Sequence, residues 1–238
     1  MRIYRDLAVD WYALLDPRED YLAEAQEYVA TIRRELGPGR HRLLELGAGV
    51  GNNAHWLQED FELTLTDLSP DMLLLAARNC PDARTVEGDM RSLRLDQRFD
   101  VVFVHDAIAY MITEADLAAV FATATAHLRP GGLLLVAADQ TEEDFQPNTE
   151  EDGNDGDGRA LRYMEWSWRD ATQPGCIVTD FVLAMREGTE LPRVVVDRHV
   201  TGLFSGAVWL RLLAEAGYVA TLERRGGGWP AFVARLSC

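Results

Sequence analysis

The sequence predicts an α/β fold: a seven-stranded, mostly parallel sheet with a reversed C-terminal hairpin and an antiparallel β insert after the fifth strand. Two observations carry this prediction. Short apolar strands alternate with helical segments between residues 43 and 138, a pattern typical of parallel sheets with helices on both faces. After residue 138, three strand-like runs with short connections favour an antiparallel meander. The 238 residues, 47% of them hydrophobic, suffice for one large globular domain.

The first part of the chain is expected to begin with a helix. Apolar side chains between residues 21 and 32 recur at the helical period, and a Gly-Pro-Gly sequence at residues 37–39 ends the helix. Ser69 before Pro70, and Thr113 before a long apolar stripe, are typical helix starts. The expected strands are 43–46, 62–66, 84–86, 99–104 and 133–138, and the helices between them are 52–59, one from Pro70, and one from Thr113 to about Leu128.

The second part of the chain changes character. Residues 139–158 are acidic and rich in glycine, which predicts a loop for most of that stretch. The three meander strands are then expected at 162–169, 176–185 and 194–203, followed by a helix at 205–216 and closing strands at 218–222 and 232–236.

Composition excludes several classes of function. The 39 acidic and 23 basic residues give a net charge of −16, which argues against binding of nucleic acid or of anionic membranes. The apolar runs are far shorter than the roughly 18 residues of a membrane span, and the N-terminus does not resemble a secretory signal. Three scattered cysteines, Cys80, Cys176 and Cys238, suggest no disulfide framework. A cytoplasmic location is therefore expected.

A glycine-rich loop follows the first strand. Gly47, Gly49 and Gly51 stand between that strand and a helix, where glycines let a ligand approach the backbone, although a simple turn is the alternative. Asp67 ends the next strand, about 20 residues after the first glycine, where a carboxylate commonly binds the hydroxyls of a ribose. Asp89 follows the third strand. The three features converge on the crevice where such sheets bind ligands.

These motifs resemble those of the class I S-adenosylmethionine-dependent methyltransferases. Residues 45–52 (ELGAGVGN) look like the family's first motif, residues 87–90 (EGDM) resemble its adenine-binding motif, and residues 128–133 (LRPGGL) are similar to the turn before its fifth strand. The resemblance implies a Rossmann-like methyltransferase sheet and S-adenosyl-L-methionine as cofactor. The cofactor-binding residues that it implies are Glu45, Gly47, Ala48, Gly49, Gly51, Asn52, Asp67, Leu68, Met72, Asp89, Met90, His105 and Tyr12.

Within that family the chain most resembles small actinobacterial-type enzymes of natural-product and aminosugar metabolism. It departs from the aminosugar enzymes after the fourth strand, because Tyr110 stands where a histidine is expected. The resemblance divides the single domain 1–238 into a helical lid (1–40), a cofactor-binding core (41–138), a loop with the β insert (139–204), and a closing helix and strands (205–238).

Methyl transfer is an in-line displacement on a methyl group, and a base helps to remove the proton of the attacking atom. The segment after the fourth strand should face the methyl group, so His105, Asp106 and Tyr110 are the candidate catalytic residues. Each also has a structural alternative: a hydrogen bond to the loop backbone alone for His105, a cap of the next turn for Asp106, and the position of a core aromatic residue for Tyr110. Asp139 and His199 are weaker candidates, for which a structural role, cross-strand or solvent-facing for His199, is favoured.

The expected function is methyl transfer to N or O of a small-molecule acceptor. The alternatives are a nicotinamide-dependent oxidoreductase, which the GxGxG spacing disfavours, and a non-catalytic cofactor-binding homologue. Residues 152–158 superficially resemble a calcium loop but lack its key ligands, so no metal is expected. The exposed insert strands suggest a homodimer. The acidic loop disfavours a strongly anionic acceptor unless Arg159, Arg162 or Arg198 turns inward.

Overall fold

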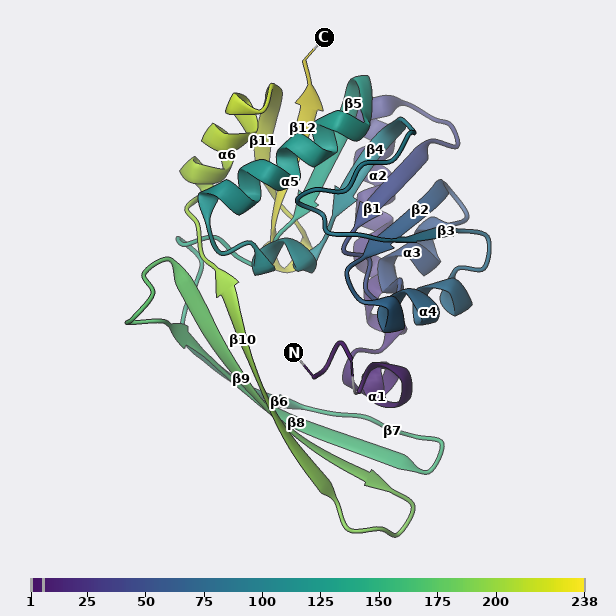
Figure 1. Ribbon diagram of the computed structural model, residues 1–238, viewed down its shortest axis with the longest axis vertical. Helices are drawn as coiled ribbons and strands as arrows, with labels where there is room; N and C mark the ends of the chain where they lie inside the picture. The colour runs from purple at the N-terminus through teal and green to yellow at the C-terminus, as the bar shows by residue number, and fades with distance from the viewer. Residues whose placement is uncertain (1, 6, 238) are drawn as a thin grey trace.

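Seven strands form the first sheet, sheet A, in a computed structural model that describes residues 2–5 and 7–237 (Figure 1). The strand order is β11-β12-β5-β4-β1-β2-β3, with β1 to β5 parallel and β12 antiparallel to both β5 and β11. The predicted mostly parallel sheet with a reversed hairpin is therefore confirmed. Its strands are β1 (Arg42–Leu46), β2 (Glu62–Asp67), β3 (Arg84–Glu87), β4 (Phe99–Val104), β5 (Leu128–Ala137), β11 (Tyr218–Arg224) and β12 (Pro230–Leu236).

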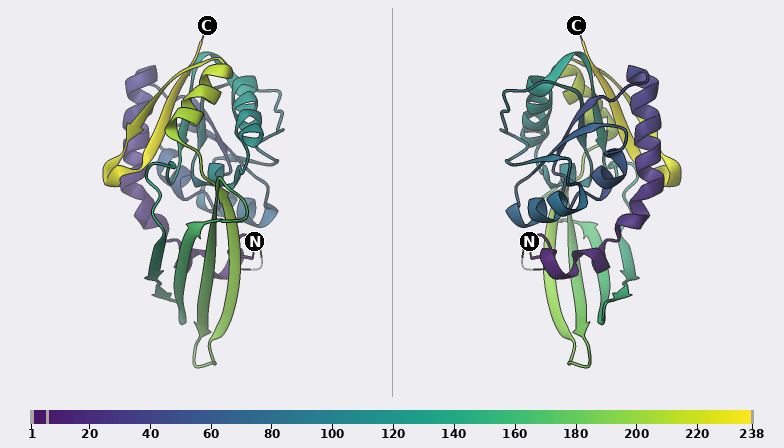
Figure 2. Two further views of the ribbon diagram at one scale, coloured as in Figure 1. Left: turned by 90° about the vertical axis from the view of Figure 1, so that its left-hand side faces the viewer. Right: turned by 90° about the vertical axis from the view of Figure 1, so that its right-hand side faces the viewer.

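Helices cover both faces of sheet A, as Figure 2 shows with the sheet seen nearly edge-on. Successive residues of each strand point to opposite faces, and both faces are apolar. In β4, Val102 and Val104 pack in one core cluster with α5 and α6, whereas Val101 and Phe103 pack in the other with α2, α3 and α4. The helices are α2 (Leu22–Leu36), α3 (Asn52–Leu57), α4 (Pro70–Asn79), α5 (Glu114–His127) and α6 (Gly206–Glu215).

The predicted helix starts at Ser69 and Thr113 are both present. The Ser69 hydroxyl accepts a hydrogen bond from the N–H of Met72, and the Thr113 hydroxyl accepts one from Asp116. The start of the fifth strand differs most from the prediction, because β5 begins at Leu128 and includes the Arg-Pro-Gly-Gly sequence that was expected to be a turn. A register irregularity between Phe99 and Val101 of the neighbouring β4 accommodates these residues.

A second, antiparallel sheet, sheet B, leaves the domain after β5 and confirms the predicted insert. Its order is β10-β9-β8-β6, with β7 paired to β8. Residues 139–158 were expected to be mostly loop, yet they contain β6 and β7. All five residues of β6 are polar and exposed, so no apolar alternation marked the strand in the sequence. The strands are β6 (Asn148–Asp152), β7 (Asp155–Gly156), β8 (Arg159–Arg169), β9 (Cys176–Glu187) and β10 (Arg193–Gly202).

The N-terminal segment lies between the two sheets (Figure 1). It contains α1 (Ala8–Leu15) and the short helix η1 (Arg18–Tyr21). Trp11 packs with Leu183 and Val195 on sheet B, whereas Tyr12 packs with Val50 and Met72 beside the glycine loop of sheet A. Two further short helices are η2 (Asp106–Tyr110) and η3 (Gly226–Gly228). None of the helices in the described part of the chain is long and apolar enough to cross a membrane.

Candidate active site

The glycine loop connects the end of β1 to the start of α3. Gly47 and Gly49 have φ angles of 75° and 55°, which favour glycine. A Cβ on Gly47 would collide with the side chains of Ala107 and Met90, so the loop packs tightly on that side. A Cβ on Gly49 would meet nothing within 4 Å. The backbone of Gly49 therefore faces open space, where a ligand can approach it.

Asp67 lies beside this opening, at the end of β2. Its carboxylate accepts hydrogen bonds from the N–H groups of Gly49 at 2.9 Å and Ser69 at 2.8 Å. Burial raises the pKa of Asp67, and the backbone donors counteract that rise. The next residue, Leu68, is 66% exposed. An apolar surface and a carboxylate thus stand together at the mouth of the loop.

Asp89 and Met90 follow β3, and the N–H of Gly88 donates to the Asp67 carbonyl at 3.0 Å. Asp89 forms an ion pair with Arg91 at 2.7 Å, which is the main reason that its pKa is lowered. The segment that contains Asp89, after β3, therefore lies next to Asp67, at the end of β2, as the sequence predicted.

The N-terminal segment closes the other side of the loop. Buried Asn52, the first residue of α3, donates from its side-chain amide to the Asp16 carbonyl at 3.2 Å. The Tyr21 hydroxyl donates to the Asp16 carboxylate at 2.8 Å. Tyr12 and Met72 are in contact through the small cluster beside the loop. Asn52, Tyr12 and Met72, which were predicted as cofactor contacts, are therefore brought together with the loop.

Glu45 lies under the loop with its side chain enclosed. It is 2% exposed, and its Oε2 atom has no hydrogen-bond partner among the described residues. Burial raises the pKa of this carboxyl group to about 8. An unpartnered buried carboxyl oxygen is costly, and a donor supplied by a ligand would satisfy it.

His105, which follows β4, is held between two carboxylates. Its Nε2 lies 2.9 Å from Glu24 of α2 and its Nδ1 lies 3.0 Å from Asp106. Because carboxylates only accept hydrogen bonds, both ring nitrogens carry hydrogen and the imidazole is charged. Burial lowers the pKa of His105, but Asp106 and Glu24 outweigh it and the net shift is upward. Glu24 was not selected as a site residue from the sequence, because nothing local to α2 marks it.

Asp106 and Asp139 form an acidic pair at the carboxyl ends of β4 and β5. Burial and the neighbouring Asp106 raise the pKa of Asp139, so that the pair retains a proton. Burial raises the pKa of Asp106, but His105 opposes this and the net shift is downward; half of the side chain is exposed, at 51%, so solvent weakens the effect. The pair thus favours sharing one proton over carrying two negative charges.

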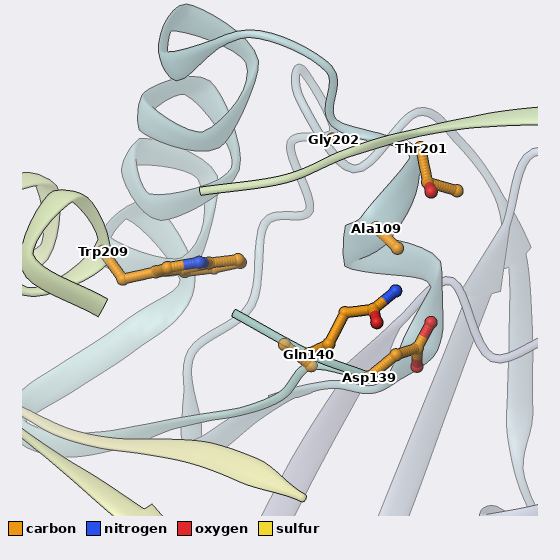
Figure 3. Close-up of a pocket in the computed structure, with 7 residues that line it drawn as sticks. Ala109, Asp139, Gln140, Thr201, Gly202 and Trp209 are labelled. Atoms are coloured by element: carbon orange, nitrogen blue, oxygen red, sulfur yellow. The ribbon is translucent and has the colours of Figure 1, made fainter. Parts of the chain in front are cut away.

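A small cavity adjoins this acidic pair, and Figure 3 shows Asp139 and Gln140 pointing toward Ala109 and Thr201. Its volume of about 10 Å³ is enough for one water molecule. Trp209 of α6 lines the far side. The cavity joins the end of sheet A to β10 of sheet B, so both sheets contribute to this side of the site.

Tyr110 ends η2 and makes two hydrogen bonds to distant parts of the chain. Its hydroxyl lies 2.9 Å from that of Tyr4 and 2.7 Å from Nδ1 of His199. His199, on β10, is only 4% exposed, so of its two expected structural roles the solvent-facing one is wrong. Its Nε2 lies 3.3 Å from the Asp197 carboxylate. Tyr4 and Asp197 were missed, since sequence spacing holds no signal for contacts between residues about 90 to 195 positions apart.

Within residues 2–5 and 7–237, no group of three or more His, Cys, Asp or Glu side chains is arranged to hold a metal ion.

The strand order of sheet A, the glycine loop after β1 and the acidic residue after β2 define the class I methyltransferases. A family model described as a methyltransferase domain matches residues 43–132. The chain is 31% identical over 219 residues to dTDP-3-amino-3,4,6-trideoxy-alpha-D-glucopyranose N,N-dimethyltransferase of Streptomyces venezuelae, covering 90% of this chain and 91% of that protein.

Solved structures of methyltransferases are also similar to this chain. DesVI of Streptomyces venezuelae has a TM-score of 0.84 at 26% identity, over 92% of each chain. CalS10, an amino pentose methyltransferase from Micromonospora echinaspora solved with its cofactor bound, has a TM-score of 0.81 at 25% identity, over 91% of this chain and 92% of that one. The chain belongs to the class I S-adenosylmethionine-dependent methyltransferases, in the group that includes the aminosugar N,N-dimethyltransferases.

The protein is therefore a methyltransferase that uses S-adenosylmethionine on a small-molecule acceptor, rather than a nicotinamide enzyme. The residues present fit this cofactor. The open space at Gly49 and the carboxylate of Asp67 suit the nucleoside, and the unpartnered oxygen of Glu45 can accept from its ammonium group.

Proposed function

We propose that this enzyme methylates an amino group, rather than a hydroxyl group, of a small sugar-like acceptor. The single observation that carries this proposal is the acidic pair of Asp106 and Asp139 beside the charged His105. An amine reaches the site as an ammonium ion, and a pair with one negative charge compensates that ion in a partly desolvated environment. A neutral hydroxyl group would gain no such compensation.

The residues divide into three roles in this proposal. Gly49, Asp67, Asp89 and Glu45 hold the cofactor, whose sulfonium, when bound, supplies the methyl group and leaves as a neutral thioether. The remaining proposed cofactor contacts are Gly47, Ala48, Gly51, Asn52, Leu68, Met72, Met90, His105 and Tyr12.

Near the acceptor, Asp106 binds the ammonium group and Tyr110 contacts its nitrogen. His105 orients Asp106 through the 3.0 Å ion pair and does not act as the base, because a ring with both nitrogens protonated has no free lone pair. The three candidates predicted from the sequence thus receive different roles.

The printed substrate of the Streptomyces venezuelae relative is an amino sugar joined to dTDP, and we propose an amino sugar as the acceptor class here. The sequence suggested three arginines of the insert as partners for an anionic acceptor, and each forms an ion pair within sheet B. Arg159 pairs with Glu187. Arg162 pairs with Asp155, and Arg198 pairs with Asp180 on the solvent-facing side of sheet B. The aminosugar portion is therefore the part of the acceptor that this site recognises.

Mass spectrometry of acceptor methylation tests the proposal. The enzyme would be incubated with S-adenosylmethionine and dTDP-3-amino-3,4,6-trideoxyglucose, with the same sugar freed of its nucleotide, and with the corresponding 3-hydroxy sugar. We expect methylation of an amino sugar and none of the hydroxy sugar. Methylation of the hydroxy sugar alone would overturn the proposal.

We further propose that the enzyme is a homodimer that pairs the solvent-facing side of sheet B. Val194 and Val196 of β10 are 60% and 59% exposed, and Met164 of β8 is 40% exposed. The register places Val196, Val182 and Met164 in one row across three strands. Exposed apolar side chains gathered in this way, here beside the Arg198–Asp180 ion pair, often mark a surface that another protein covers, and a second copy offers the same face for a two-fold contact.

Light scattering tests the dimer. The wild-type protein should have twice the monomer mass, and Val196→Glu should shift it to the monomer. Val219→Glu is the matched control, because Val219 is 70% exposed on β11 of sheet A. A monomeric wild-type protein would refute this arrangement.

A further inference from the structure

A chain of hydrogen bonds connects the proposed acceptor site to the interior of sheet B. It runs from Tyr4 through Tyr110 and His199 to Asp197, with distances of 2.9, 2.7 and 3.3 Å. Asp197 in turn accepts from the backbone N–H groups of Arg2 at 2.5 Å and Ile3 at 2.9 Å. The four side chains come from three separate parts of the chain: the N-terminal segment, η2 and β10.

The carboxylate of Asp197, at the end of this chain, determines which group donates in each of the three hydrogen bonds. The Asp197 carboxylate only accepts, so Nε2 of His199 carries the hydrogen and Nδ1 presents its lone pair. The Tyr110 hydroxyl therefore donates to Nδ1. Because that uses its only hydrogen, Tyr110 must accept from the Tyr4 hydroxyl. The Tyr110 oxygen is left with a lone pair to receive a proton.

We propose that Tyr110, His199 and Asp197 form a proton relay that removes the proton of the acceptor nitrogen. This inference rests on the proposed N-methylation. Tyr110 touches the acceptor, whereas His199 acts through Tyr110 and Asp197 acts through His199. The arrangement corresponds to a catalytic triad of a hydroxyl, an imidazole and a carboxylate, in which the phenol of Tyr110 takes the place of the hydroxyl that contacts the substrate.

The proposed step balances in atoms and charge. One N–H bond of the ammonium group breaks and its proton moves to the Tyr110 oxygen, while the Tyr110 proton passes to Nδ1 of His199. The electron pair left on nitrogen forms the new bond to the methyl carbon, and the pair of the breaking carbon–sulfur bond stays on sulfur. The positive charge of the sulfonium ends on the methylated nitrogen, and the removed proton leaves His199 for solvent between turnovers.

The two histidines near the site differ in the property that this step needs. His105 is already doubly protonated between two carboxylates and cannot accept. For His199, burial lowers the pKa below 6.5 and Asp197 only partly offsets it, so the ring is neutral at pH 7. Within the described residues, the charged or titratable side chains around the relay include Asp197 on β10, Tyr110 on η2 and Tyr4 on the N-terminal segment, with Asp106 and Asp139 beyond the two tyrosines. Glu165 of β8 lies in the same cross-strand row as Asp197, and Phe181 and Thr179 of β9 face the relay without charge.

The pH dependence of kcat tests the relay in the full-length enzyme with a methylated amino sugar. Wild-type kcat should rise with pH through one ionisation and then level off above the pKa of His199. In His199→Gln, kcat near pH 7 should fall about 100-fold, and it should keep rising at alkaline pH as the ammonium group deprotonates in solution. His41→Gln, at the opposite end of β1 from the glycine loop, is the matched control and should retain the wild-type profile.

Binding of S-adenosylhomocysteine separates this role from a structural one, since it should stay within about twofold of wild type in His199→Gln. Tyr110→Phe provides a second variant with the same expected pH profile, and the double variant should be no slower than either single one. A kcat within threefold of wild type, or an unchanged pH profile in either variant, would overturn the relay. If the wild-type enzyme methylates only a hydroxyl acceptor, the amine proposal fails, and the same variants then test the relay on that acceptor.

Discussion

Replacing Gly49 by alanine should weaken cofactor binding without unfolding the enzyme. The positive φ of 55° costs an alanine about 1–2 kcal/mol, which lowers the melting temperature of a domain this size by roughly 2–8 °C. The added methyl group meets no protein atom within 4 Å, so it adds no clash in the free enzyme. It does occupy the space where the cofactor must approach the backbone.

The loss of affinity can be worked from that geometry. Separating the ligand from one backbone hydrogen bond costs about 0.5–1.5 kcal/mol, and crowding by one methyl group costs about 1–3 kcal/mol more. The sum corresponds to roughly a 10-fold to 1,000-fold increase in the Kd for S-adenosylhomocysteine. Calorimetry measures the Kd, and thermal unfolding without ligand measures the stability.

Alanine variants of Gly188 and Gly47 provide the comparison for this experiment. Gly188 in the β9–β10 turn has a φ of 53° and equally open surroundings, so Gly188→Ala should lose the same stability and keep wild-type affinity. Gly47→Ala should be more destabilised than either, because its Cβ overlaps Ala107 and Met90. Wild-type affinity in Gly49→Ala would refute the placement of the cofactor at this loop.

Three further predictions concern stability and are read by urea unfolding. Burial raises the pKa of Glu45 from 4.5 to about 8, so the folded protein binds this proton more tightly than the unfolded chain and loses stability as pH rises between those values. Glu45→Gln should remove a pH dependence on the order of a few kcal/mol; equal pH profiles would contradict this. Ser69→Ala removes the cap of α4 and should cost about 1 kcal/mol, whereas Ser69→Thr should cost less. Phe121→Ala, at a fully buried site in the α5 core, should cost about 3–5 kcal/mol, and a loss below about 1 kcal/mol would contradict the packing.

Local patterns in the sequence predict most of sheet A because each of its elements carries its own signal. The β-branched run at 99–104, the Ser69-Pro70 start and the glycine loop need no knowledge of distant residues. Strand β6 has no such signal, because its residues Asn148–Asp152 are all polar and exposed. Its pairing is set by the open edge of β8, which is a property of the assembled sheet.

The same distinction applies to the candidate active site, because some of its residues can be predicted from local sequence patterns and others cannot. Asp67 and the glycines lie close together because successive parallel strands end at one edge, so the fold class alone brings them together. The partners of Tyr110 depend on how sheet B folds back over the domain, and His199 is 89 residues away. His105 was selected as a base because of its position, but Glu24 and Asp106 on either side determine its charge.

Successive side chains of β10 face opposite sides of sheet B, and the two sides have different roles. Asp197 and His199 point toward the site, while Val196 and Arg198, which alternate with them, point to the opposite side of the sheet. A single inserted or deleted residue in the turn before this strand could slip the register by one position, exchanging the two sets. Such a change would put an arginine and valines against the acceptor and a histidine and an aspartate on the outer face. Substitutions at the odd-numbered positions of β10 therefore change the surface that faces the site, whereas substitutions at its even-numbered positions change the outer face.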